Sequence, residues 1–183
     1  MIITITGKPC SGKGTVSKIL CDKYNFEYIC TGDMFRTLAY SYGYDNILEF
    51  QKDERIKDVD NMIDSKIKQI GIDRINDDII IDSRLAWNFI PNSFKVFIDV
   101  DWNIAGERLL NAKRDSEQVL NLETAIKKAK DRWDIENNRY IELYNTDNTN
   151  PNNYNLVISS NNASPEELAE LIYTEYKKFM LKA

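Results

Sequence analysis

A glycine-rich stretch, GKPCSGKGT, fills residues 7–15 and directly follows the apolar run Ile2–Thr6. Apolar side chains at helical spacing continue over 13–24, so the stretch joins a predicted strand to a predicted helix. Glycines in such a loop allow a tight turn that aims backbone N–H groups inward, and the helix N-terminus adds the positive end of its dipole. A glycine turn that happens to precede a helix is the alternative. Strand, glycine loop and helix in this order nevertheless predict a nucleotide phosphate site.

The loop departs in one place from the general phosphate-binding pattern G-x-x-x-x-G-K-[ST]. Gly14 stands where the pattern has a hydroxyl side chain for Mg²⁺, and Thr15 carries a hydroxyl one position later. Lys13 keeps the mobile positive charge for the β- and γ-phosphates, which makes it a candidate catalytic residue. We expect ATP to be bound by Gly7, Cys10, Ser11, Gly12, Lys13, Gly14 and Thr15.

The rest of the chain alternates segments typical of strands with segments typical of helices. We expect further strands at 27–30, 77–84, 95–100 and 155–159, and helices at 31–43, 46–70, 102–112, 122–144 and 165–180. Asp101 and Ser164 are the expected N-caps of the helices that follow them. The run IIID within 77–84 is apolar and bounded by charge, as in a central parallel strand buried on both faces. The alternation predicts an α/β fold, with one parallel sheet, helices on both faces and all 183 residues in one domain.

Charged residues follow two of the predicted strands, at the edge of the sheet where ligands of open α/β proteins gather. TGDMFR at 31–36 places Asp33 and Arg36 at the start of a helix, and Asp82 and Arg84 follow the central strand. The two arginines could grip a phosphate with bidentate forks, and Asp82 could hold a hydrated Mg²⁺. Alternatively, these residues only cap a helix, form a turn and make surface ion pairs. Their convergence opposite a phosphate loop favours a site for a second nucleotide.

The composition narrows the function classes further. A net charge of −5 argues against a general nucleic-acid binder, but a few arginines focused in a cleft can still hold a nucleotide. The absence of histidine excludes histidine acid–base chemistry and histidine-ligated zinc. There are three cysteines without a C-x-x-C pair, no run long enough to span a bilayer and no signal-peptide pattern. We therefore expect a cytoplasmic protein with no membrane partner.

In their order and spacing, these motifs resemble a cytidylate kinase of the short archaeal type, within the nucleoside monophosphate kinase family. The resemblance covers nearly the whole chain and rests on GKPCSGKGT, TGDMFRTLA, DVDNMIDSKI, IIIDSRLAW, FIDVDWNIAGERL, RWDIENNRY and YNLVISSNNASPEEL. It implies a P-loop NTPase-type three-layer sandwich whose five-stranded parallel sheet has the order 2-3-1-4-5. It also implies a helical insertion at about 44–70 that binds the monophosphate nucleotide, and a short lid at about 112–122.

The same resemblance implies roles for arginines beyond the phosphate loop. Arg108 would lie against the ATP base, and Arg114 would lie in the lid. Arg132 and Arg139 are seven residues apart and share a helix face, and they would close over the phosphates as catalytic transition-state clamps. If that helix is instead solvated, they make only i,i+4 pairs, such as Arg132 with Glu136.

Mg²⁺ is the cofactor that the resemblance implies. It would be held mainly by ATP oxygens and waters, with Asp82 acting through a water and Thr15 near the α-phosphate. Two loop residues differ from the family's usual pattern, because Lys8 and Cys10 are bulkier than the residues often found at those places.

The acceptor base is predicted from two carboxylates of the insertion. Asp60 and Asp64 share a helix face, and a carboxylate suits the amino group of cytosine, although a polar outer face explains them equally well. We expect a monomeric enzyme that moves the γ-phosphoryl group of ATP to CMP or dCMP. The same reaction on AMP, UMP or another small acceptor is one alternative. A non-catalytic nucleotide-binding regulator is an alternative of a different class.

Overall fold

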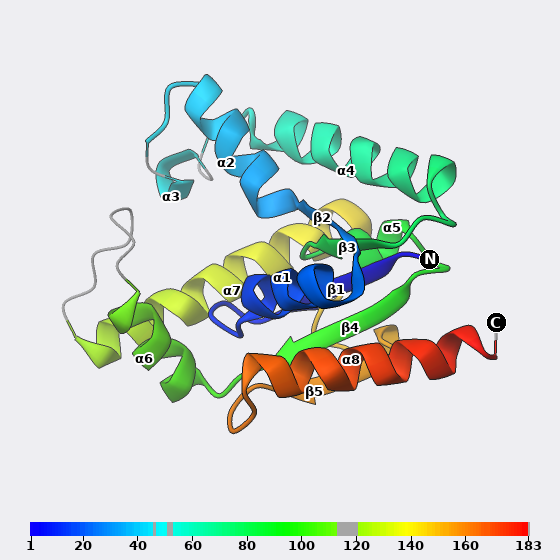
Figure 1. Ribbon diagram of the computed structural model, residues 1–183. Helices are drawn as coiled ribbons and strands as arrows, with labels where there is room; N and C mark the ends of the chain where they lie inside the picture. Colours follow the sequence, from blue (N-terminus) through cyan, green and yellow to red (C-terminus); the bar gives the residue numbers. More distant parts are fainter. Residues whose placement is uncertain (46, 51–52, 113–120, 183) are drawn as a thin grey trace.

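The centre of the molecule is a sheet of five parallel strands in the order β2-β3-β1-β4-β5 (Figure 1). The computed structural model describes residues 1–45, 47–50, 53–112 and 121–182. The strands are β1 (Ile3–Gly7), β2 (Glu27–Cys30), β3 (Ile79–Asp82), β4 (Phe94–Asp99) and β5 (Leu156–Ser159). The predicted parallel sheet and its order are confirmed.

Helices occupy most of the remaining described chain. They are α1 (Lys13–Tyr24), α2 (Thr31–Ser41), α3 (Ile47–Phe50), α4 (Ile56–Asp73), α5 (Ala86–Phe89), α6 (Trp102–Asn111), α7 (Leu122–Tyr144), α8 (Pro165–Met180) and the short 3₁₀ helix η1 (Pro151–Asn153). None of the described helices combines the length and the apolarity needed to cross a membrane.

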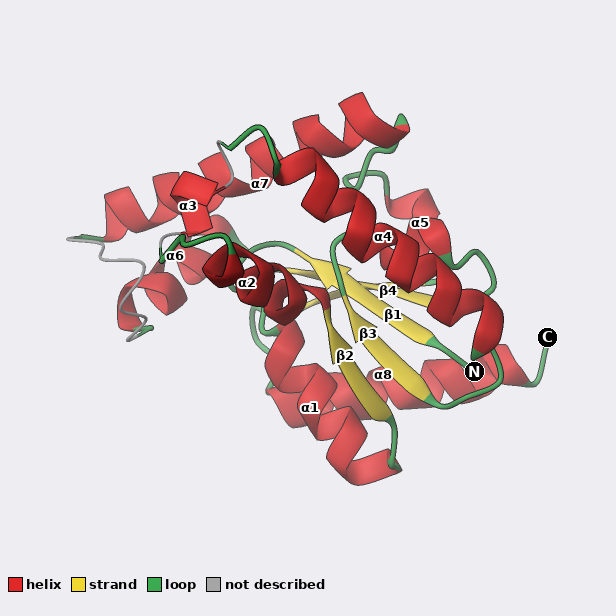
Figure 2. Ribbon diagram, turned by 90° about the horizontal axis from the view of Figure 1, so that it is seen from above, coloured by secondary structure: helices red, strands yellow, loops and turns green. Residues whose placement is uncertain are grey.

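The helices form one layer on each face of the sheet, as Figures 1 and 2 show. On one face, α1 and α8 cover the side chains of Ile3, Ile5 and Ile80. On the other face, α2, α4 and α5 cover Ile79 and Ile81. The central strands are thus apolar on both faces, which is why IIID reads as an unbroken hydrophobic run. The predicted three-layer α/β architecture is confirmed.

Local capping signals agree with the structure. The Asp101 carboxylate accepts a hydrogen bond from the backbone N–H of Asn103 at 2.8 Å and begins α6. Ser164 and Glu167 form a reciprocal capping box at the start of α8. Helix α2 has Cys30 as its N-cap, and the hydroxyl of its first residue, Thr31, donates to the carbonyl oxygen of Asp82 at 3.3 Å.

The region predicted as one helix at 46–70 is divided into α3 and α4, and α4 continues to Asp73. Phe50 ends α3 fully buried, with its ring against Tyr42 and Tyr44. Beyond it, the Asp53 carboxylate accepts hydrogen bonds from the backbone N–H and the Nε of Arg55, at 2.8 and 2.9 Å. Burial of an aromatic ring and this local turn outweigh the helical periodicity.

The strand register decides where the chemistry-bearing loops meet. Asp82 of β3 is level with Ile5 of β1 and with Cys30 of β2, and Gly7 of β1 is level with Ile98 of β4. Because the strands are parallel, the segments that follow β1, β2 and β3 emerge at the same edge of the sheet. Ligand sites of open α/β folds lie at this edge.

The Asn-rich loop 145–153, for which the sequence indicated no function, has a structural role. Asn148 is fully buried, and its side-chain oxygen accepts a hydrogen bond from the Trp87 indole at 3.0 Å. The Asn148 backbone oxygen accepts a second bond, from the Tyr154 hydroxyl at 2.9 Å. The loop therefore supplies a hydrogen-bond partner to a buried tryptophan.

We predict that Asn148→Ala lowers the free energy of unfolding by about 1–3 kcal/mol, because the buried indole N–H of Trp87 is left without an acceptor. Urea denaturation measures the difference. Asn152→Ala, at an exposed position in the same loop, is the control and should unfold like the wild type. Equal stability of both variants would contradict the structural role of Asn148.

Candidate active site

A cavity of about 710 Å³ opens at the carboxyl edge of the sheet. The phosphate loop, the start of α2, α4, the end of β3 and α7 all contribute to its lining. Among the residues predicted from the sequence, the lining includes Cys10, Ser11, Gly12, Lys13, Gly14, Thr15, Asp33, Arg36, Asp60, Asp64, Asp82, Arg84, Arg108, Arg132 and Arg139. Gly7 is outside that lining, and its contribution is conformational.

At Gly7, the first residue of the phosphate loop, the structure leaves no room for a side chain. Gly7 has a φ of +153°, and a Cβ there would lie 2.1 Å from the carbonyl oxygen of Ile98. Gly12 has a φ of +85° and precedes α1. Ser11 is 1% exposed, and among the described residues its hydroxyl has no hydrogen-bond partner. A tight loop with an unsatisfied buried hydroxyl at a helix N-terminus fits an anionic group such as phosphate.

The two bulky loop residues leave this geometry intact. Lys8 forms an ion pair with Asp99 at 2.7 Å and donates to the carbonyl oxygen of Val100 at 3.2 Å. It is therefore held at the end of β4 and does not line the cavity. Cys10 lines the cavity and adopts a φ of +61°, in the left-handed region.

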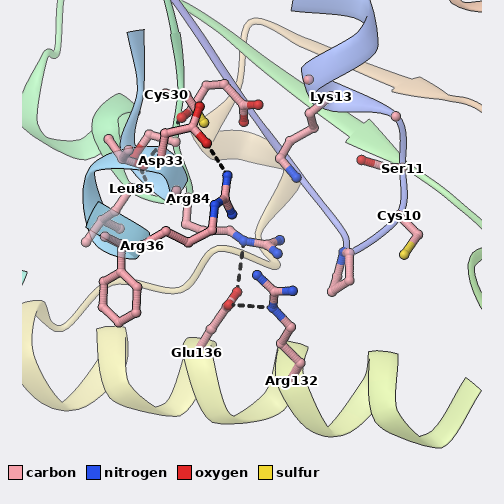
Figure 3. Close-up of a pocket in the computed structure, with 18 of the residues that line it drawn as sticks. Cys10, Ser11, Lys13, Cys30, Asp33, Arg36, Arg84, Leu85, Arg132 and Glu136 are labelled. Atoms are coloured by element: carbon pink, nitrogen blue, oxygen red, sulfur yellow. Dashed lines mark hydrogen bonds and ion pairs between the residues drawn. The ribbon is translucent and has the colours of Figure 1, made fainter. Parts of the chain in front are cut away.

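Lys13 extends from the start of α1 toward the guanidinium groups of Arg84 and Arg132 (Figure 3). Burial and, after it, the positive charge of Arg84 together lower the pKa of Lys13 to about 8, against the opposing effect of Asp82. An anionic ligand would relieve this repulsion between cations. The electrostatics of the site thus favour a phosphorylated ligand.

The donor set near Gly14 fits a hydrated Mg²⁺. A Cβ on Gly14 would lie 3.5 Å from Asp82 Oδ2, so the missing side chain leaves this carboxylate directly beside the phosphate loop. The Tyr28 hydroxyl donates to the same oxygen at 3.2 Å. In the described part of the chain, no group of three or more His, Cys, Asp and Glu side chains could hold a metal. Mg²⁺ in kinases takes one or two carboxylates, several waters and phosphate oxygens, and Asp82 can supply the carboxylate.

The two arginines predicted to bind the acceptor are held differently. Arg36 makes an ion pair with Asp33 within α2, on the cavity side (Figure 3). Arg84 donates from Nη1 to the carbonyl oxygen of Gly7, which ties it to the phosphate loop. Both guanidinium groups reach the space that Lys13 faces, so the structure brings the two predicted phosphate sites together.

Glu136 of α7 is the charged residue that sequence reasoning missed as part of the site. It is 4% exposed, and it forms ion pairs with Arg84 at 2.8 Å and with Arg132 at 3.1 Å. The sequence analysis considered the i,i+4 pair of Glu136 with Arg132 only as a feature of a solvated helix. The pair is present, but the helix is not solvated at Glu136, because this side chain is buried and faces the cavity.

Helix α4, which lies in the predicted insertion, contacts α7 through two polar pairs. Arg139 forms an ion pair with Asp60 at 3.2 Å, and the Tyr144 hydroxyl donates to Asp64. Burial raises the pKa of Asp60 to about 6, against the opposing charge of Arg139. Asp60 and Asp64 are therefore not on a polar outer face, and the alternative that placed them there is wrong.

Arg108 occupies the opposite end of the cavity. Its guanidinium donates to the backbone oxygen of Cys10 at 3.1 Å and to the backbone oxygen of Ser160 at 2.7 Å. It thereby joins the phosphate loop to the segment after β5, and its contact with an ATP base stays a prediction. Arg114 and most of the predicted lid, residues 113–120, lie outside the described residues.

Several known proteins resemble this chain in sequence or in fold. A family model described as an AAA domain matches residues 6–127. A cytidylate kinase of Methanocaldococcus jannaschii is 32% identical over 178 residues, covering 94% of this chain and 95% of that protein. A crystal structure of a shikimate kinase from Bacteroides thetaiotaomicron superposes with a TM-score of 0.64 at 13% identity, over 98% of each chain.

Another relative is longer. An S-adenosylmethionine-dependent nucleotide dehydratase of Lacinutrix mariniflava is 34% identical over 178 residues, which are 96% of this chain and 36% of that protein. This chain therefore spans about a third of the length of that relative.

The five-stranded parallel fold, the phosphate loop and the cationic residues of the cavity, together with the similarity to known kinases, define an ATP-dependent P-loop kinase. The chain belongs to the nucleoside monophosphate kinase family, in the group of the archaeal-type cytidylate kinases.

The raised pKa of Asp60 has a consequence for stability. A carboxyl group that is harder to ionise in the folded than in the unfolded state stabilises the fold at low pH, and this contribution is lost as the pH rises through its folded pKa of about 6. We predict that, between about pH 4 and pH 7, the wild type loses up to about 3 kcal/mol of unfolding free energy relative to Asp60→Asn.

Denaturant titrations over this pH range measure the difference between the two proteins. Asp134→Asn removes an exposed carboxylate of α7 and serves as the control, whose stability should run parallel to that of the wild type. A constant difference between wild type and Asp60→Asn at every pH would disprove the buried titration.

Proposed function

We propose that this protein transfers the γ-phosphoryl group of ATP to CMP or dCMP, giving ADP and CDP or dCDP. One observation carries the proposal: cationic side chains of two predicted phosphate sites line one cavity. Lys13 and the phosphate loop belong to the first predicted site, and Arg36 and Arg84 belong to the second; all of them border the same cavity (Figure 3). A hydrolase needs only the first of these sites. A kinase that transfers a phosphoryl group from one nucleotide to another needs both.

Phosphoryl transfer asks the protein mainly for alignment and for positive charge around the moving group. Lys13 would contact the β- and γ-phosphates, and Arg36 and Arg84 would hold the acceptor phosphate in line. Arg132 would lie beside the group in transit. The acceptor phosphate is already ionised near neutral pH, so no general base is required. When bound, Mg²⁺ would neutralise charge on the ATP oxygens, with Asp82 holding its waters.

The pair formed by Asp60 and Arg139 supports a cytosine acceptor. Cytosine presents an amino donor beside ring acceptors, so it can use a carboxylate and a guanidinium together. Uracil presents a carbonyl oxygen where cytosine has the amino group, and a carboxylate would repel it. The cytidylate kinase relatives point the same way. In this proposal Arg139 acts on the base as well as on the phosphates.

Other features of the sequence-based account stay predictions. They are the insertion at about 44–70 as a mobile nucleotide-binding unit, the lid at about 112–122, the monomeric state and the cytoplasmic location. The same reaction with AMP or UMP and a non-catalytic nucleotide-binding regulator are the competing functions.

A panel of acceptors tests the proposal. The protein is incubated with ATP, Mg²⁺ and one of CMP, dCMP, UMP, AMP or GMP, and ADP formation is measured. Turnover confined to the cytidine nucleotides supports the proposal, and turnover with AMP assigns the acceptor site to adenine. Bound ATP without turnover of any acceptor would favour the regulator.

Arg36→Ala should abolish most acceptor use and leave ATP binding intact, because Arg36 belongs to the second phosphate site alone. We expect kcat/KM for CMP to fall by about 100-fold. Arg74→Ala is the control, since Arg74 pairs with Glu27 and Asp77 on the surface. Calorimetric titration with ATP checks the first site. Equal loss of ATP affinity would show that Arg36 is not specific to the acceptor.

Asp60→Asn tests the assignment of the base. We predict that the ratio of kcat/KM for CMP over UMP falls by about 10-fold, because the amide is a weaker acceptor for the cytosine amino group. Asp134→Asn is again the matched control. An unchanged ratio would exclude Asp60 from base recognition.

A further inference from the structure

We propose that Glu136 is a positioning residue that fixes the acceptor-side Arg84 and the α7 residue Arg132 relative to each other, so that both phosphates are in line for transfer. The inference rests on the proposed kinase function and adds to it a residue that touches neither nucleotide. Glu136 reaches both arginines from the interior, on the side of α7 that faces the cavity (Figure 3).

The contacts of Glu136 use the inner edge of each arginine. Oε2 pairs with Nε of Arg84 at 2.8 Å, and Oε1 accepts a hydrogen bond from Nε of Arg132 at 3.1 Å. The hydrogen bond through Nε fixes the direction of the Arg132 guanidinium, because Nε lies nearest the aliphatic stem and the terminal nitrogens extend beyond it. The Arg84 guanidinium is held by its ion pair with Oε2 together with the hydrogen bond from its Nη1 to the Gly7 carbonyl oxygen. One carboxylate with an oxygen for each partner thus sets the separation of two cationic groups that come from different elements.

Arg84 extends this arrangement to the ATP side. Its Nη1 donates to the carbonyl oxygen of Gly7, and its guanidinium lies 5.8 Å from the centre of the Trp133 ring. Trp133 is buried on α7, one turn before Asn137 and on the same helix as Glu136. The phosphate loop, the end of β3 and α7 are therefore connected through one guanidinium. Moving Glu136 would disturb the acceptor site and the donor site together.

The charge of Glu136 also explains how the cations stay close before phosphates enter. Burial alone would raise the pKa of Glu136, but the charges of Arg84 and Arg132 hold it below the usual range, so the carboxylate remains ionised. It also opposes the lowering of the Lys13 pKa. An ionised carboxylate in this place could have either of two effects. It could align the arginines, or it could compete with phosphates for them.

The second partner of Arg84 favours alignment. A competing carboxylate would be expected to take the terminal fork of the guanidinium, which is the edge that binds a phosphate bidentately. Nη1 of that fork instead donates to the phosphate-loop backbone, and Nε is the Arg84 atom that lies 2.8 Å from Glu136 Oε2, in an ion pair and not in a hydrogen bond. Both partners of the ion pair are largely buried, with the Arg84 side chain 15% and the Glu136 side chain 6% exposed.

Two substitutions separate the role from a contribution to folding alone. Glu136→Gln keeps the shape and removes the charge, and Glu136→Asp keeps the charge but is too short to reach both arginines. We expect kcat at saturating ATP and CMP to fall by about 100-fold in Glu136→Gln, because misplaced phosphates lose their in-line geometry. Glu136→Asp should also be slowed, while its fold is retained. Affinities for ATP alone and for CMP alone should change far less than kcat.

The measurements are kcat per folded molecule, calorimetric affinities for each nucleotide and thermal unfolding by circular dichroism. Glu142→Gln removes an exposed carboxylate from the same helix and should match the wild type in all three. If Glu136 had only a structural role, the melting temperature would fall and kcat per folded molecule would not. If Glu136 competed with phosphates, Glu136→Gln would bind nucleotides more tightly and turn over at least as fast. Either result overturns the proposal.

The same series distinguishes this inference from the proposed function. A wild type that phosphorylates no nucleoside monophosphate overturns both. An active wild type with an equally active Glu136→Gln overturns only the positioning role.

Discussion

The parallel pairing of β1 with both β3 and β4 is the constraint on which the site depends. Gly7 ends β1 and has no Cβ, so the chain can turn against the Ile98 backbone of β4 and continue into α1. On the other side, β1 holds β3 in a register that brings Asp82 and Arg84 to the same edge. The phosphate loop and Arg84 are thus neighbours because of backbone hydrogen bonds within the sheet. Their order in the sequence alone would not bring them together.

Several positively charged side chains line the cavity at that edge, and the fold has to hold them close together against their mutual repulsion. Lys13, Arg84 and Arg132 come from three different elements, and their repulsion contributes to the lowered pKa of Lys13. Glu136 offsets part of that repulsion from the interior. Phosphate groups of two nucleotides would offset the remainder from the open side. The geometry therefore links ligand binding to the electrostatic state of the protein, which is how a P-loop kinase gains affinity for phosphates on a chain with a net charge of −5.

Features with local causes could be predicted from the sequence. The bounds of α1, β2 and α7 agree to the residue with the sequence-based prediction, and the caps at Asp101 and Ser164 are confirmed, because periodicity and capping depend on neighbouring residues. The motif order also indicated which loops meet at one edge. What could not be predicted depends on contacts between distant segments.

The burial of Glu136 follows from the passage of α7 over the end of the sheet, and Asn148 is buried because Trp87, 61 residues away, needs an acceptor. The ion pair of Lys8 with Asp99 likewise joins β4 to the phosphate loop. In sequence these are ordinary polar residues, and only the fold gives them partners.

The fate of the γ-phosphoryl group tests the central claim most directly. ATP labelled in the γ-phosphate is incubated with the protein, Mg²⁺ and CMP, and the labelled products are separated. The proposed pair of phosphate sites predicts that the label appears in the β-phosphate of CDP, in an amount equal to the ADP formed. Label recovered as inorganic phosphate, with CMP unchanged, would contradict this account and show that water, and not a second nucleotide, is the acceptor.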